Sequence, residues 1–502
     1  MKFSRPLLTA FMFSLLAACG HQRPALNGNI AISAKRIPAN LNEQITGSGT
    51  ARPVGIPGPP APQAAQGARL SAFAQTVITA RDRDMSTHAG ICADLLQKDI
   101  SGDAGQPLAK GYAIVLSGGG PHGTFGAGLF LGLQDKGQLP PEPEVVTGVS
   151  TGSLQSTFVF LARQPVAKDR DYSWINPKAL PLHSLPGAGN QPPLAKGRSN
   201  LEDLALAYSI GREGEILKPG SLGDLSLITD GARAQLTPLR KRLFRMISPN
   251  TITQLATEAC RGRVLLVGVT DVDDGNGYAL DLTGLALKAF EGEASQTRMT
   301  LVRNTYVSAL MASSSVPVGA MPVTLRYREF DDEDKPSDIA SRQHMFIDGG
   351  ARFGVFLPKG SDGSDLTLIV NTFLDTPPWT PGDPAIPTTK WKLIGLGLRT
   401  VNDLLETQIY NLSVGQVEAA AGKLSMAYLS NQNIVGPDGR PGESPVAHVY
   451  LGRNCGQWQS EVDALHHPLQ FSPDYMACLI DYGRSRGNLA QWNLTKPELK
   501  HQ

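Results

Sequence analysis

Residues 110–123 read KGYAIVLSGGGPHG, an apolar run that leads into three consecutive glycines and then into a helical pattern. The run at residues 112–116 has the short aliphatic composition of a strand buried on both faces. Glycines let the backbone turn where a Cβ would clash, so successive N–H groups can point at an anion. Pro121 suits the first helical turn, and the apolar spacing that follows it predicts a helix packed on a sheet: Phe125, Leu129, Phe130 and Leu133. The stretch therefore predicts a strand, an amide-rich loop and a helix N-terminus, which together form an anion site.

The next strand indicates which anion this is. Gly118, Gly120 and Gly123 match GxGxxG, the pattern of dinucleotide-binding loops. Such a domain would carry a carboxylate for the ribose at the end of the following strand. Here the strand at residues 145–147 leads instead into GVSTG at residues 148–152, before another helical pattern. This arrangement is typical of a nucleophile elbow, in which two glycines allow a tight turn that lifts a serine hydroxyl, here Ser150, out of the sheet.

A carboxylate follows a later predicted strand. Residues 344–347, HMFI, lead into Asp348, Gly349 and Gly350. A serine that attacks an ester carbonyl needs a base within hydrogen-bond reach. A carboxylate is a weak base in water, but enclosure by apolar strand residues raises its pKa. The amides of the glycine loop would then stabilise the tetrahedral oxyanion, so the three segments together indicate acyl-transfer chemistry.

The N-terminus predicts export and lipidation. Lys2 and Arg5 precede an apolar core at residues 7–16, which is shorter than the roughly 20 residues that span a membrane. The ending LAAC at residues 16–19 resembles the lipobox of bacterial lipoproteins, which implies a lipid on Cys19. In lipoproteins an aspartate after the cysteine favours the inner membrane, and Gly20 therefore favours the outer membrane, facing the periplasm. An ordinary cleaved signal with an incidental cysteine is the alternative.

Composition limits the other possibilities. The formal net charge of +1 gives no electrostatic basis for nucleic-acid binding. Four cysteines besides Cys19 permit disulfides in an exported chain, and Cys455 with Cys478 would close the shortest loop, although free buried thiols are an equal alternative. The cysteine spacing forms no zinc pattern, and we expect neither a metal nor a cofactor. An insertion at residues 164–263 is interpreted either as a cover over the site or as a helical layer that closes the core.

Four features in order resemble the patatin-like phospholipase family. They are the glycine loop, the GVSTG elbow, residues 312–322 and the Asp348 segment, and together they cover about residues 112–358. The resemblance implies a three-layer α/β/α fold with a central, mostly parallel sheet, and a Ser/Asp dyad with Ser150 as nucleophile and Asp348 as base. It places the oxyanion donors in the loop Gly118, Gly119, Gly120 and Pro121, and gives supporting roles to Gly123, Gly148, Gly152, Gly349 and Gly350. Two residues depart from the family pattern: His122, where Arg or Lys is common, and Ser315, where alanine is usual. His122 is interpreted as a surface residue at a helix start.

These observations divide the chain into a signal peptide (1–18), a Pro/Gly/Ala-rich tether (19–68), a helical lead-in (69–111), the catalytic domain (112–358), the remainder of the α/β domain (359–430) and a C-terminal extension (431–502). The predicted function is that of a lipid-anchored serine acyl hydrolase acting on phospholipid or another acyl ester. An acyltransferase that uses the same acyl-enzyme and a non-catalytic lipid-binding lipoprotein are alternatives. So is the α/β-hydrolase fold, which requires a late histidine, with three candidates: His448, His466 and His467.

Overall fold

The computed structural model describes residues 23–26, 30–37, 88–98, 109–173, 175, 199–219, 232, 234–292, 296–317, 319–330, 341–358, 363–375, 405–431, 434–435, 441–442, 444–464, 471–490 and 492. The signal peptide, Cys19, most of the predicted tether, and His466 and His467 lie outside these residues.

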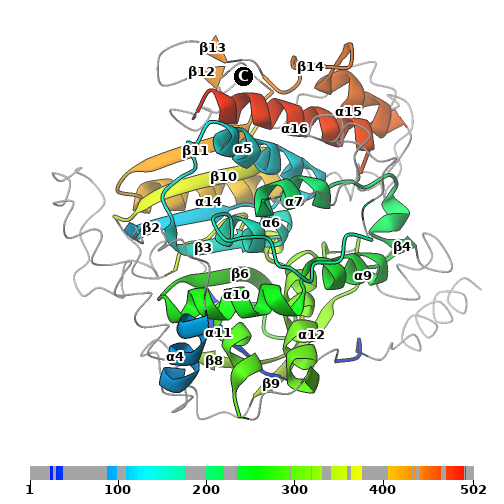
Figure 1. Cartoon of the computed structure of the whole chain (residues 1–502). Helices are drawn as coiled ribbons and strands as arrows, with labels where there is room; N and C mark the ends of the chain where they lie inside the picture. The colour runs from blue at the N-terminus through cyan, green and yellow to red at the C-terminus, as the bar shows by residue number, and fades with distance from the viewer. Residues whose placement is uncertain are drawn as a thin grey trace, which may run out of the picture.

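A nine-stranded sheet runs through the centre of the described structure (Figure 1). Five strands lie parallel in one half, in the order β11 (Leu424–Leu429), β10 (Asp365–Phe373), β2 (Ala109–Leu116), β3 (Pro143–Val149) and β6 (Val264–Asp271). Their apolar runs are buried on both faces, as parallel strands between helices require. The predicted α/β fold with a mostly parallel central sheet is confirmed.

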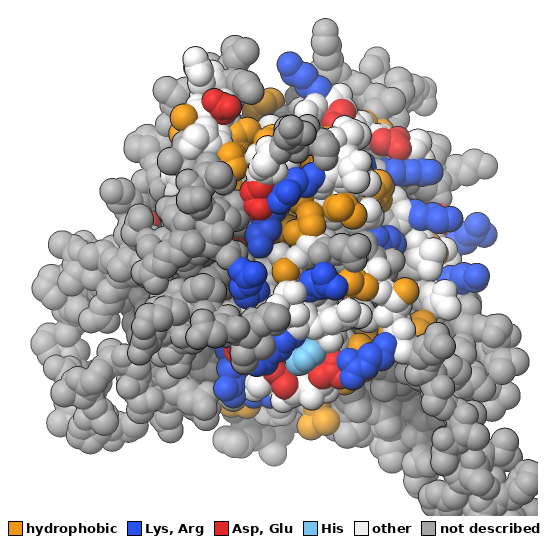
Figure 2. Space-filling model, turned by 90° about the horizontal axis from the view of Figure 1, so that it is seen from below, with side chains coloured by type: hydrophobic (Ala, Val, Ile, Leu, Met, Phe, Trp, Pro, Cys, Tyr) orange, Lys and Arg blue, Asp and Glu red, His pale blue; other side chains and the backbone are white. Residues whose placement is uncertain are grey.

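The second half of the sheet curls into a closed ring. From β6 the order continues through β7 (Gly277–Asp281), β1 (Ile32–Ile37), β8 (Val323–Phe330) and β9 (Arg342–Asp348). Strand β9 then pairs back onto the carboxyl end of β6, next to the part of β6 that pairs with β3. Rings of Tyr278, Tyr327 and Phe346 pack against one another with centroids 5.3–6.4 Å apart. Seen from below (Figure 2), the face around the ring carries Lys and Arg side chains with apolar side chains between them.

Helices cover both faces of the sheet and bury two separate cores. Alternate residues of β2 point to opposite sides: Ile114 and Leu116 to one core, Ala113 and Val115 to the other. The first core packs against the helices α5 (Gly123–Asp135), α6 (Thr151–Phe160), α7 (Asn200–Ala207), α9 (Thr237–Met246), α10 (Pro249–Cys260), α11 (Leu282–Leu287), α12 (Gln296–Ser313) and α16 (Pro473–Asn488). The second core packs against α14 (Glu406–Ala420) and residues 353–357. These three layers match the prediction.

Several predicted boundaries were wrong. Part of the predicted tether is strand β1, inside the ring, because its apolar residues Ile32, Ala34 and Ile37 are buried there. The helical spacing of residues 391–412 in the sequence predicts a helix that continues toward residue 429, but helix α14 ends at Ala420 and residues 424–429 form strand β11. The many charged residues at 328–342 in the sequence predict a loop, but strand β8 extends to Phe330 and strand β9 begins at Arg342.

The predicted C-terminal extension is partly integral to the fold. Helix α16 packs along α5, and a Cβ on Gly128 of α5 would lie 2.1 Å from the carbonyl oxygen of Ile480 in α16. Helix α15 (Cys455–Ala464) is joined to α16 by the disulfide Cys455–Cys478, the pair that closes the shortest loop. A second disulfide, Cys92–Cys260, joins α4 (His88–Lys98) to α10. Among the described helices, none is long and apolar enough to cross a membrane.

Candidate active site

Ser150 lies on a strained turn between β3 and α6. Its φ of 52° and ψ of −124° are rare for a residue with a side chain, and this conformation is the one expected at a nucleophile elbow. The flanking glycines allow the turn because a Cβ on Gly148 would lie 2.5 Å from the Gly152 carbonyl oxygen, and one on Gly152 would lie 2.4 Å from that of Leu116. The turn is therefore encoded by the local sequence.

Strand β6 brings the predicted base to the predicted nucleophile. Val149, the residue before Ser150, is paired with Gly268 of β6. The next residue of β6, Val269, is paired with Asp348 at the end of β9. Two strands that arrive from opposite directions thus end at adjacent residues of the same strand. The Ser150 side chain lies close enough to the Asp348 carboxylate to lower its pKa, so the structure brings together the two residues of the predicted dyad.

The third family-like segment, at residues 312–317, holds both strand ends in place. The Ser313 hydroxyl accepts a hydrogen bond from the Ser150 amide at 3.0 Å and donates one to the Gly268 carbonyl at 2.7 Å. The Ser315 carbonyl accepts a hydrogen bond from the Asp348 amide at 2.9 Å. The Ser315 hydroxyl, where alanine is usual in the family, donates to the carbonyl of Met311 in the last turn of α12 at 2.9 Å and makes no contact with the dyad that would replace this bond.

Burial gives the Asp348 carboxylate the pKa of a useful base. Asp348 is 3% exposed, and loss of hydration raises its pKa from 3.8 to about 7. Hydrogen bonds from the Ser150 hydroxyl and from the Gly350 amide, the latter at 2.7 Å, oppose this rise because they stabilise the charged form. A base whose pKa lies near neutrality both accepts and returns a proton readily at that pH.

The glycine loop presents two backbone donors. The Gly118 amide donates to the Gly354 carbonyl at 3.3 Å, whereas the amides of Gly119 and Gly120 donate to no acceptor in the described part of the chain. Gly119 has a φ of +141°, and a Cβ there would lie 1.6 Å from the carbonyl oxygen of Asn371. Only glycine fits that position. Two of the four predicted donors thus need correction: Pro121 has no N–H to donate, and the Gly118 N–H is already engaged.

His122 supports this loop and is not the surface residue that we expected. Its ring packs edge-on against Phe373 and Tyr475, with centroids 5.4 and 5.8 Å away. Burial lowers its pKa to about 4, and a hydrogen bond to the Gly119 carbonyl opposes this shift. His122 is therefore neutral at physiological pH, and its backbone amide donates a hydrogen bond to the Gly119 carbonyl at 3.0 Å.

Tyr410 of α14 is a site residue that sequence reasoning missed. A Cβ on Gly118 would lie 1.9 Å from the Tyr410 hydroxyl, so this hydroxyl rests directly on the start of the glycine loop. Burial, together with the nearby charges of Glu406 and Asp348, raises the pKa of Tyr410 well above its usual value. Nothing in the helical spacing around residue 410 distinguishes this tyrosine from a core residue. Asn371 was also missed, although a lone amide in the apolar strand LTLIVNT at residues 366–372 is a detectable signal.

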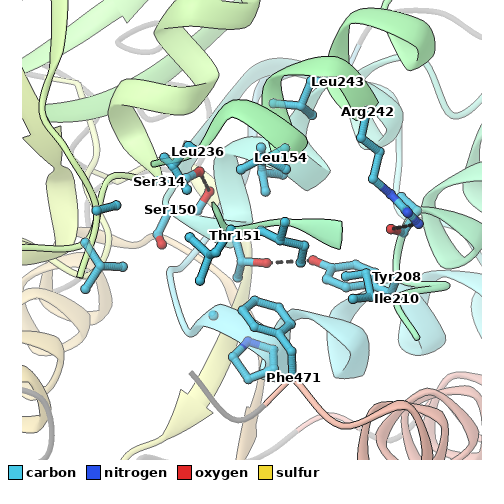
Figure 3. A pocket seen from close by; sticks show the side chains of 18 of the residues that line it. Ser150, Thr151, Leu154, Tyr208, Ile210, Leu236, Arg242, Leu243, Ser314 and Phe471 are labelled. Carbon is cyan, nitrogen blue, oxygen red and sulfur yellow. Dashed lines mark hydrogen bonds between the residues drawn. The ribbon is translucent and has the colours of Figure 1, made fainter. Parts of the chain in front are cut away.

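An apolar cavity of about 140 Å³ adjoins Ser150 (Figure 3). The insertion at residues 164–263 supplies much of its wall through α7, α9 and the segments beside them. The same helices also pack in the first core, so both interpretations of the insertion have support. Its lining residues are mostly aliphatic, among them Leu154, Leu204, Ile210, Leu236, Leu239 and Leu243. The Arg242 guanidinium also lies in the wall and donates to the carbonyls of Ala207 and Ser209, each at 3.0 Å.

The alternative that requires a late histidine receives no support from His448. Its Nε2 lies 3.0 Å from a carboxylate oxygen of Asp481, and its ring packs against Tyr482. Ser150 is instead paired with Asp348. The other two candidates, His466 and His467, lie outside the described residues.

One described group has the composition of a metal site, and it lies at the carboxyl end of β6. Asp271, Asp273 and His344 place their ligand atoms within 4.8 Å of one another. The His344 Nδ1 lies 2.6 Å from Asp271, and the Asp273 carboxylate accepts two hydrogen bonds from the Arg23 guanidinium. An arginine thus supplies the positive charge at this cluster.

A family model described as patatin-like phospholipase matches residues 114–357. No curated protein matches the sequence significantly. VipD from Legionella pneumophila is 12% identical with a TM-score of 0.20, over 51% of this chain and 50% of that one. The human GIVD cytosolic phospholipase A2 is 12% identical with a TM-score of 0.28, over 85% of this chain and 63% of that one. The chain thus spans about half the length of VipD.

Proposed function

Because residues 114–357 belong to the patatin-like phospholipase family, we propose that the chain hydrolyses acyl-ester lipids with Ser150 as nucleophile and Asp348 as base. The observation that carries this proposal is that strand pairing places Ser150, which lines an apolar cavity, beside the buried carboxylate of Asp348. Substrate chemistry follows from that cavity, because an aliphatic wall suits the acyl chain of an ester and not a sugar or a charged group.

The reaction divides into two acyl transfers. Ser150 Oγ bonds to the ester carbonyl carbon while its proton passes to Asp348, and the amides of Gly119 and Gly120 stabilise the oxyanion. The ester C–O bond then breaks, and the leaving alkoxide takes the proton from Asp348. A water molecule attacks the acyl-enzyme, gives a proton to Asp348 and releases the fatty acid. That proton returns to Ser150 Oγ, which restores the dyad.

The cavity volume limits the acyl group that it can enclose. A cavity of ~150 Å³ lined by aliphatic and aromatic residues holds one benzene molecule. The cavity beside Ser150, at about 140 Å³, therefore encloses about six carbon atoms. We infer that medium-length acyl chains fill it and that longer chains extend beyond it.

A fluorophosphonate probe tests the nucleophile. We expect covalent labelling of the folded protein at Ser150 and none in Ser150→Ala. Ser156→Ala is a matched control, because Ser156 is also a buried serine of α6, and its hydroxyl donates to the Ser153 carbonyl at 2.7 Å, away from the dyad. If Ser150→Ala is still labelled, or the folded wild type is not, the site is not a serine hydrolase and a lipid-binding role is favoured.

Hydrolysis and acyl transfer share the acyl-enzyme and differ in the acceptor. Incubation with a phospholipid panel, with and without an added alcohol, separates the two, because hydrolysis releases fatty acid and transfer yields a new ester. We propose hydrolysis as the main reaction.

We also propose that the protein is an exported lipoprotein, anchored through Cys19 at the periplasmic face of the outer membrane. This proposal rests on the sequence LAACG at residues 16–20, which follows an apolar segment preceded by two positive charges. Mass spectrometry of the mature N-terminal peptide should find Cys19 at its first position with acyl groups attached. An unmodified N-terminus, or cleavage elsewhere, would reject the anchor.

A further inference from the structure

The residues just after the proposed lipidation site are bound to the folded domain. The Arg23 guanidinium donates two hydrogen bonds to the Asp273 carboxylate, at 2.9 and 2.7 Å. The Pro24 carbonyl accepts a hydrogen bond from the Thr324 hydroxyl at 2.6 Å. Strand β1 follows and pairs with β7 and β8 inside the ring. The chain is thus attached to the domain from residue 23.

This attachment lies at the edge of the sheet that carries the catalytic serine. Asp273 stands two residues beyond the carboxyl end of β6, and Ser150 directly follows the carboxyl end of the neighbouring parallel strand β3. Carboxyl ends of adjacent parallel strands meet at the same edge. Thr324 follows a segment whose residues Val316, Gly319 and Ala320 line the cavity. The anchored segment therefore lies at the same edge of the sheet as Ser150, which lines the cavity.

The distance from Cys19 to this wall is short. Arg23 is the fourth residue after Cys19, and a fully extended chain of four residue steps spans at most about 14 Å. A random coil of about 50 residues, as the predicted tether would be, has a typical end-to-end distance of roughly 40 Å and would leave the domain free to rotate. The docked segment removes that freedom.

We propose that the lipid anchor orients the enzyme, so that the carboxyl edge of the sheet, with Ser150, the cavity and the loop after β6, faces the bilayer. This inference rests on the proposed lipidation of Cys19. The loop contributes an apolar contact: Val272 is 45% exposed between two aspartates, one of which holds Arg23. An acyl ester leaving the bilayer then has a short path to the serine.

A polarity-sensitive fluorophore on an engineered cysteine tests the orientation. The four cysteines Cys92, Cys260, Cys455 and Cys478 are paired in disulfides, so Val272→Cys offers a reactive thiol. Leu489→Cys is the matched control, an equally apolar residue that is 63% exposed near the end of α16. With the lipidated protein on vesicles of phosphatidylethanolamine and phosphatidylglycerol, we expect a blue shift and a several-fold rise in emission at position 272, and neither at position 489.

A spacer variant separates orientation from anchoring. Insertion of about 20 Gly and Ser residues between Cys19 and Arg23, a coil spanning roughly 25 Å, retains the lipid but frees the domain. We expect this variant to bind vesicles as the wild type does but to lose the blue shift and the rise in emission at position 272. It should hydrolyse vesicle phospholipid several-fold more slowly and a soluble ester at the wild-type rate.

The outcomes distinguish this inference from the proposed function. Vesicle binding without a signal at position 272, or an unchanged signal in the spacer variant, overturns the orientation alone. Failure of the mature protein to bind vesicles overturns both the anchor and the orientation. If the wild-type chain without its lipid does not hydrolyse a soluble ester, the catalytic proposal is rejected instead.

Discussion

Replacing Asp348 by asparagine should abolish activity and at the same time stabilise the fold at alkaline pH. The carboxyl group has a pKa of about 7 when folded and 3.8 as a free side chain, so the folded state binds its proton more tightly. Such a group contributes stability that is fully present below pH 4 and is lost as the pH rises to about 7. The difference between the two pKa values corresponds to about 4 kcal/mol at pH 8, at 1.36 kcal/mol for each pKa unit.

Asparagine removes this cost because it is neutral at every pH and its carbonyl can still accept the Gly350 amide. We expect urea unfolding of Asp348→Asn at pH 8 to give a free energy of unfolding up to about 4 kcal/mol above wild type. The gain should shrink as the pH falls and vanish near pH 4. The control Ser150→Ala also abolishes activity but keeps the buried carboxylate, so it should show no such gain.

One result would refute this reasoning. If Asp348→Asn is no more stable than wild type at pH 8, or if its gain is the same at pH 4 and pH 8, burial does not raise the pKa of this carboxyl group. Asp348 would then be an ordinary capping residue at a strand end.

Three further predictions concern the same site. The kcat/KM of the wild type for a soluble ester should rise with pH to a plateau with its midpoint near 7, because only the ionised Asp348 accepts a proton; a profile flat from pH 5 to pH 9 would contradict this. Gly119→Ala should lower kcat on the order of 10²-fold or more, because the added Cβ would lie 1.6 Å from the Asn371 carbonyl oxygen and displace an oxyanion donor. An unchanged circular dichroism spectrum should show that the variant is folded. If the folded variant turns over at the wild-type rate, the loop is not the oxyanion site. Leu243→Trp should shift the preference toward shorter acyl esters by filling the cavity while a small fluorophosphonate still labels Ser150, and an unchanged chain-length profile would exclude the cavity as the acyl site.

The chemistry of the site was largely predictable because its parts are local. A strand-glycine-helix junction and a GxSxG elbow are each encoded within about ten residues, since glycine permits the backbone conformations and close approaches that these turns need. The family resemblance then identified Asp348. What local patterns could not reveal was the shell around these residues, because Ser313, His122 and Tyr410 reach the site through contacts made only after folding.

Wrong predictions also arose where a segment finds its partner far away in the chain. Residues 30–37 lie next to a Pro- and Gly-rich region, and their apolar pattern is too short to predict a strand. Residues 32–37 nevertheless form β1, which pairs with β7 and β8. Residues 424–429 continue a helical spacing, but pairing with β10 makes them a strand. Tertiary context overrides local preference in both cases.

The sequence by itself determined the reactive groups: a serine on a forced turn, a run of glycine amides and an acid at the end of an apolar strand. The tertiary structure brings these groups together, because β3 and β9 pair with adjacent residues of β6. This pairing places the Ser150 side chain beside the buried carboxyl group of Asp348. The tertiary structure also decided that the chain is fixed to the domain four residues after Cys19, through a contact between Arg23 and Asp273 that spans 250 residues and that no local pattern encodes.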